Sequence, residues 1–119
     1  LVDWWKTVGM QAGDLIVDRA HGYGHGGEMI TRVVMALAAG LVRAEQAQNE
    51  QPAEKLSYYG KYLMNSGSPF VAYGDFHDYC TGGAWGDTSH ATAEKGAELI
   101  RRAVEAIGDF LAESFSRLP

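Results

Sequence analysis

The sequence is poor in cysteine, and this scarcity excludes several kinds of site. Cys80 is the only cysteine among the 119 residues. A single thiol cannot close a disulfide within the chain, and a zinc site built on cysteines needs more than one of them. We therefore expect a reducing location, the cytoplasm.

Positive charge and long apolar runs are also scarce. Ten basic residues face fifteen acidic ones, which gives a formal net charge of −5, so no basic surface that would follow nucleic acid phosphates is expected. The most apolar stretch, residues 33–42, contains Gly40 and is shorter than the roughly 20 residues that span a bilayer. We expect no nucleic acid and no membrane partner. The 46% hydrophobic content allows the core of one domain.

An initiator methionine is missing too, since the chain begins at Leu1. Its first residues do not show the charged, apolar and small-residue regions of a signal peptide. We expect an upstream segment that was removed by processing, is encoded separately or was left out.

Two helices follow from the spacing of apolar residues. A buried face at three- and four-residue steps is predicted after Glu28 as far as Val42, and again from Ile100 to Phe115. Thr92 is a suitable N-cap for the second helix, and acidic side chains favour the first turns of both.

Strands are expected in four shorter segments, which are apolar, β-branched or aromatic: residues 1–6, 14–18, 70–73 and 76–79. For residues 14–18 a helical turn is nearly as consistent with so short a segment. The glycine-rich segment 20–27 and the polar segment 45–54 are predicted to be loops.

The strongest chemical signal is His21-Gly-Tyr-Gly-His25-Gly-Gly-Glu28, which places two imidazoles and a carboxylate on a loop that opens a helix. Such groups bind borderline cations or transfer protons near neutral pH. The alternative is equally consistent with the residues: solvated histidines, and a Glu28 that only complements the helix dipole.

The same loop contains Gly22-x-Gly24-x-x-Gly27, a weak match to a dinucleotide fingerprint. A nucleotide-binding module is the less favoured alternative, because no second strand ending in an acidic residue follows promptly. A second cluster would bring Asp75, His77 and Tyr79 to one face of a strand, with a structural role expected for the neighbouring Cys80.

Three stretches, in the same order, resemble the creatininase (creatinine amidohydrolase) family. They are Val2–Trp5, the segment from His25–Thr31 through Met35–Leu37 to Leu41–Val42, and Gly86–Gly96. The resemblance implies an α/β fold, a three-layer α/β/α sandwich with a mainly parallel sheet, of which residues 1–119 would be the C-terminal portion of one domain. It also implies a metal-dependent amidohydrolase that cleaves a non-peptide C–N bond, of the cyclic amide or formamide type. Two divalent ions (Zn, Mn or Fe) would activate water.

Residue by residue, the resemblance makes His25 the catalytic proton shuttle and Glu28 a metal ligand, and it places Trp5, His21 and Tyr23 with the substrate-binding residues. Two positions depart from the family pattern: Ile30 stands for its second glutamate and Arg32 for a serine. These departures put in doubt the contacts that would support the metal ligands, or the substrate specificity.

The family's other metal ligands lie upstream of Leu1, and a two-metal site needs about five or six protein donors. We therefore expect a partner, either the N-terminal half of the same protein or a separate homologous subunit. The resulting homo- or hetero-oligomer would be a hexamer or similar ring, since family members tend to form one. The alternative is a non-catalytic or degenerate creatininase-like subunit with an assembly role.

Overall fold

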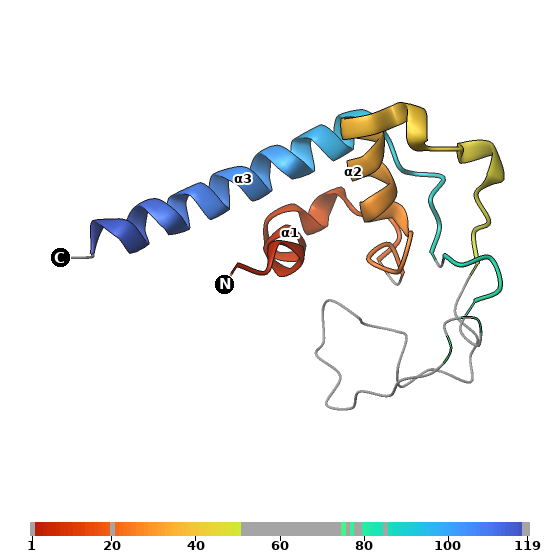
Figure 1. Cartoon of the computed structure of the whole chain (residues 1–119), viewed down its shortest axis with the longest axis horizontal. Helices are drawn as coiled ribbons and strands as arrows, with labels where there is room; N and C mark the ends of the chain where they lie inside the picture. Colours follow the sequence, from red (N-terminus) through yellow and green to blue (C-terminus); the bar gives the residue numbers. More distant parts are fainter. Residues whose placement is uncertain are drawn as a thin grey trace.

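A computed structural model describes residues 2–19, 21–50, 75, 77, 80–84 and 86–117. Within these residues the chain forms three α-helices: α1 (Trp4–Ala12), α2 (Glu28–Ala38) and α3 (Ala93–Ser116) (Figure 1). Short 3-10 turns follow α1 at Gly13–Leu15 and α2 at Ala39–Leu41, and a third lies at Ala44–Gln46.

Helix α1 begins at a side-chain cap. Asp3 has extended backbone angles, and its carboxylate accepts the Lys6 backbone N–H at 3.3 Å. This cap satisfies one of the N–H groups that the first turn of a helix leaves without a partner. The helix then buries Val8 and Ala12 and ends at Ala12, with Gly13 as its C-cap.

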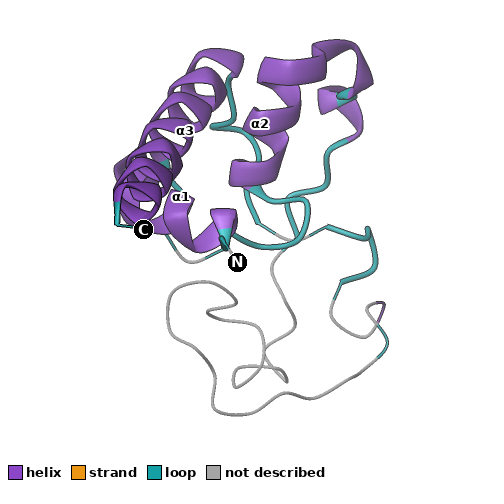
Figure 2. Cartoon of the chain, turned by 60° about the vertical axis from the view of Figure 1, so that its left-hand side comes forward, coloured by secondary structure: helices purple, strands orange, loops and turns teal. Residues whose placement is uncertain are grey.

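The expected α/β sandwich is wrong for the part of the chain that the structure describes, which holds helices and loops but no strand (Figure 2). Residues 4–6 of the first expected strand belong to α1. In the second, the 3-10 turn Gly13–Leu15 takes up the first residues, and the backbone N–H groups of Val17 and Asp18 bind a carboxylate instead of a neighbouring strand. Segments 70–73 and 76–79, apart from His77, lie outside the described residues.

These two failures have one physical cause. A strand satisfies its backbone hydrogen bonds only through another strand, so its formation depends on distant chain. A capped helix satisfies them within itself, and the aromatic start of the chain takes that route.

Both helices predicted from apolar spacing are confirmed as α2 and α3. Thr92 caps α3 by accepting the Lys95 backbone N–H at 3.2 Å, and Glu94 lies in its first turn. Gly96 lets α3 approach α2 closely, because a Cβ at this position would overlap the carbonyl oxygen of Arg32. The expected loop is confirmed for residues 21–27, which form turns.

One hydrophobic core joins the three helices and the segment after α1. Its buried members come from all of these elements: Val8, Ala12, Ile16, Met29, Leu99 and Ala103. Many other apolar residues of the predicted helix faces stay exposed, with Leu37 at 72% and Phe115 at 66%. The C-terminal half of α3 extends beyond α1 in Figure 1. The core therefore covers only part of the apolar surface that the helices present.

None of the helices in the described ranges is long and apolar enough to cross a membrane.

Candidate functional site

The histidine loop, residues 21–27, is folded by its own backbone. The Gly24 N–H donates to the carbonyl of His21 at 2.6 Å, and the Gly27 N–H donates to that of Gly24 at 3.0 Å. Gly26 has a φ of 66°, in the left-handed region that favours glycine. The Met29 N–H donates to the Gly22 carbonyl at 2.9 Å, so the loop is tied to the first turn of α2.

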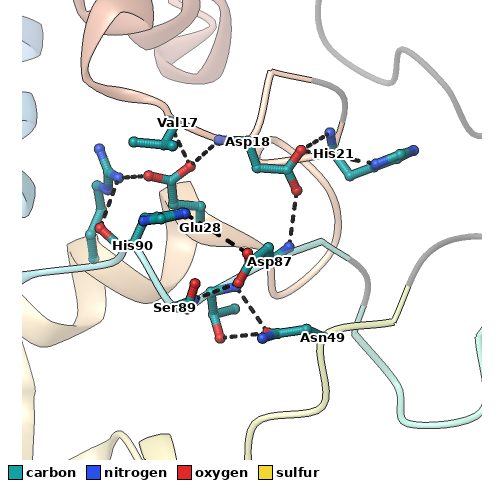
Figure 3. Close-up of polar contacts among 10 residues, drawn as sticks. Val17, Asp18, His21, Glu28, Asn49, Asp87, Ser89 and His90 are labelled. Atoms are coloured by element: carbon teal, nitrogen blue, oxygen red, sulfur yellow. Dashed lines mark hydrogen bonds and ion pairs between the residues drawn. The ribbon is translucent and has the colours of Figure 1, made fainter.

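Glu28, the first residue of α2, is completely buried. Its Oε2 accepts the backbone N–H groups of Val17 and Asp18, both at 2.8 Å, and its Oε1 accepts from the guanidinium of Arg32 (Figure 3). The carboxylate therefore has partners on both oxygens and joins the start of α2 to the segment that follows α1.

Arg32, one turn further along α2, is also completely buried. Besides Glu28, its guanidinium donates to the carbonyl of Leu15 at 2.5 Å and, more weakly, to that of His90 at 3.5 Å. Burial lowers the pKa of this guanidinium, while the negative charge that Tyr23 can carry opposes the shift. Its Nε is buried without a hydrogen-bond partner in the described structure.

A second carboxylate, that of Asp18, binds the first residue of the loop, His21. Its Oδ1 accepts the His21 backbone N–H at 2.9 Å and lies 4.0 Å from the His21 Nδ1. Its Oδ2 accepts the backbone N–H of Asp87 at 2.9 Å, across 69 positions of sequence (Figure 3). Asp18 therefore connects His21 to the segment that leads into α3.

The segment leading into α3 forms a polar turn of its own. Hydrogen bonds from Ser89, chiefly, lower the pKa of the Asp87 carboxyl. Asp87 Oδ2 lies 3.9 Å from His90 Nε2, and Asn49 Oδ1 accepts the Thr88 backbone N–H at 3.0 Å. Asp18 was not predicted as a site residue, and His90 only as part of a structural segment, 87–96, before the last helix. The acid three residues before His21 was the one available signal for the first of them.

The five predicted site residues fall in different surroundings. His25 is exposed on the loop, whereas Glu28, three positions later, is buried. Trp5 and Tyr23 pack against the hydrophobic core. Burial, the largest cause, raises the pKa of the Tyr23 hydroxyl, and Arg19 and Arg32 oppose this shift. The structure thus brings His21 to Asp18 and Glu28 to Arg32. The contacts among the described residues do not test the roles assigned to the five residues, which stay predictions.

The described residues do not by themselves fit a metal centre. Among them, no group of three or more histidine, cysteine, aspartate or glutamate side chains is arranged to hold an ion. Glu28, the predicted ligand, already accepts three hydrogen bonds. Most donors of any metal centre would therefore have to come from elsewhere.

The two minor sequence patterns find little support. No strand precedes the glycine loop in the described ranges, so the context of a dinucleotide fingerprint is missing there. Cys80 is buried, and burial raises the pKa of its thiol, which makes it a poor nucleophile and agrees with a structural role. The backbone N–H of His77 donates to Asp75 at 3.0 Å, but Tyr79 lies outside the described residues.

Comparison with known proteins matches most of the chain to a family model. The sequence model of a protein family, Creatininase, described as creatinine amidohydrolase, matches residues 1–111. No curated protein and no solved structure matches the chain significantly.

Proposed function

We propose, because this chain belongs to the creatininase family, that it forms part of an amidohydrolase that cleaves a non-peptide C–N bond of the cyclic amide or formamide type. The family is a hydrolase family, and the match covers most of the chain. The observation that carries the proposal for this chain is that His25 is exposed on a glycine-rich loop. The start of this loop is held by the carboxylate of Asp18, and Asp18 is held by the carboxylate of Glu28.

His25 is proposed as the proton shuttle. An imidazole exchanges protons near neutral pH, so it can accept a proton from the attacking water and return it to the leaving nitrogen. The backbone on which His25 lies is held at two places: the His21 N–H donates to Asp18, and the Met29 N–H donates to the Gly22 carbonyl. Glu28 holds Asp18 in turn, by accepting its backbone N–H.

The remaining predicted residues are proposed to contact the substrate. Tyr23 alternates with His21 and His25 along the loop, and Trp5 packs against the same core as Tyr23. The Nε1 of Trp5 is buried without a hydrogen-bond acceptor among the described residues.

Creatininase family members are generally metal-dependent, and we propose a pair of Zn, Mn or Fe ions held mainly by residues outside the described part. When bound, such ions polarise the carbonyl and activate water. The donors are proposed to come from the N-terminal half of the same protein or from a homologous subunit. The large exposed apolar residues of α2 and α3 support such a partner, because a polypeptide packed against them would remove their side chains from water.

The test of the proton shuttle is His25→Ala, made in the protein as purified natively with any polypeptide that accompanies it. Creatinine and formylated amines would be assayed as the two substrate classes. Loss of a general acid–base should lower kcat/KM by about 100-fold or more without changing the urea midpoint. His90→Ala, which removes another exposed histidine, is the matched control. A fully active His25→Ala enzyme would exclude the shuttle.

A non-catalytic subunit with an assembly role is the second candidate. Ile30 and Arg32, which stand where the family pattern has a glutamate and a serine, favour it, as does Glu28, whose two carboxylate oxygens already accept three hydrogen bonds. This candidate predicts that native material contains the chain in a stable oligomer that holds no metal and hydrolyses neither substrate class.

A further inference from the structure

We infer that Arg32 is the permanent cationic partner of Glu28, so that Glu28 is a positioning residue for the histidine loop and not a metal ligand. The inference rests on the site of the proposed function. It is tested by metal affinity and by the NMR signals of His21, and neither measurement requires catalytic turnover.

The hydrogen bonds of Glu28 provide the first argument. A carboxylate accepts at about four lone-pair positions. Three are taken, by the backbone N–H groups of Val17 and Asp18 and by Arg32. Gly22 closes the space beside Oε2, where even a Cβ would lie 3.1 Å from that oxygen. A metal ion could reach this carboxylate only by displacing an existing donor.

The charges provide the second argument. Glu28 and Arg32 are both completely buried, and they are oppositely charged one helical turn apart. The guanidinium therefore already neutralises the carboxylate, and it would repel a divalent ion placed on the same oxygens. The arginine is itself held by the carbonyl oxygens of Leu15 and His90, which fix its position.

The contacts beyond the pair show what Glu28 positions. It binds the backbone N–H of Asp18, and the carboxylate of Asp18 binds the backbone N–H of His21 (Figure 3). The Gly22 carbonyl accepts from Met29, the residue after Glu28. The Glu28–Arg32 pair therefore acts on the histidines through Asp18 and the backbone of the loop.

The experiment compares variants of the complete native protein, including any copurifying polypeptide. Glu28→Gln keeps the shape of the side chain and removes its charge, and the double variant Glu28→Gln with Arg32→Met removes both charges. Glu94→Gln is the matched control, since Glu94 lies in the first turn of α3 but is exposed. Affinity for Mn²⁺ and Zn²⁺ is measured by calorimetry after metal removal, and the His21 ring signals are measured by NMR.

We expect Glu28→Gln to lower the urea midpoint and shift the His21 signals, because a buried arginine loses its counter-charge. The double variant should restore the midpoint at least in part. Metal affinity of both variants should stay within about threefold of the wild type, as for Glu94→Gln. If the wild-type protein binds no metal, the inference stands while the metal-dependent part of the proposed function fails.

Two results would overturn the inference. One is a loss of metal affinity of tenfold or more in the folded double variant but not in Glu94→Gln, which would make Glu28 a ligand. The other is an unchanged His21 spectrum in Glu28→Gln, which would remove its positioning role.

Discussion

The two halves of α3 have the same apolar spacing but different surroundings. In the first half Leu99 is fully buried and Ala103 is 7% exposed, under α1 and α2. In the second half Phe110 is 55% exposed and Leu111 is 40% exposed, although both continue the apolar face. The helical period therefore determines which residues lie on one face, while the neighbouring elements determine whether that face is buried.

The comparison is tested most strongly by truncating one leucine in each half. Leu99→Ala removes a fully buried side chain from the core and should lower the free energy of unfolding by about 2–5 kcal/mol. Leu111→Ala removes a side chain that is already 40% exposed and should lower it by less than about 1 kcal/mol. Urea denaturation of both variants measures the difference. Equal losses would mean that a partner buries the second half as deeply as the core buries the first.

The helices could be predicted from the sequence because their information is local. Apolar spacing, a Thr92 cap and an acidic first turn are all contained within a few residues. The strand predicted at residues 14–18 failed because strand formation needs a partner that no local pattern supplies. Instead, Val17 and Asp18 bind Glu28, ten or more residues away.

The candidate site could be predicted in part. The histidine loop and the first-turn Glu28 stand out from glycine content and residue type alone. The ion pair of Glu28 and Arg32 was not predicted, although their four-residue spacing, which places both side chains on one helix face, was a signal for it. Their complete burial could not be predicted, because it depends on α3 and on the segment after α1. The contact from Asp18 to Asp87 joins distant segments and has no local signal.

Two glycines of α3 allow a second, smaller test of the same comparison. Gly96 faces α2, where a Cβ would overlap the carbonyl of Arg32, whereas a Cβ at Gly108 would meet no atom within 4 Å. Gly96→Ala should therefore destabilise the protein by about 1–3 kcal/mol through forced separation of the helices. Gly108→Ala should stabilise it by about 0.5–1 kcal/mol, because alanine favours the helix interior.

Thermal or urea unfolding of the two glycine variants provides the measurement. Opposite signs would confirm that only the first half of α3 is closely packed. Destabilisation by Gly108→Ala would instead show that the second half is packed against a partner in the protein under study.

The smallest expected effect on stability concerns Glu98, in the first half of α3. Hydrogen bonds from Arg101 and Arg102 lower the pKa of this carboxyl from 4.5 to about 2. Arg102 also binds Asp14 at 2.7 Å, so the network links α3 to the turn after α1. Because the pKa is lower in the folded state, the ionised carboxylate stabilises the fold above pH 4.5, and this contribution disappears as the pH falls toward 2.

Glu98→Gln should therefore unfold at a lower urea concentration than the wild type at pH 7, and the two midpoints should converge as the pH approaches 2. The Glu98 side chain is partly exposed, so the difference at pH 7 should be small and should shrink further in about 1 M salt, where charges are screened within about 3 Å. A pH-independent difference would instead show that Glu98 stabilises α3 through packing of its side-chain methylenes, with no contribution from the ion pairs to Arg101 and Arg102.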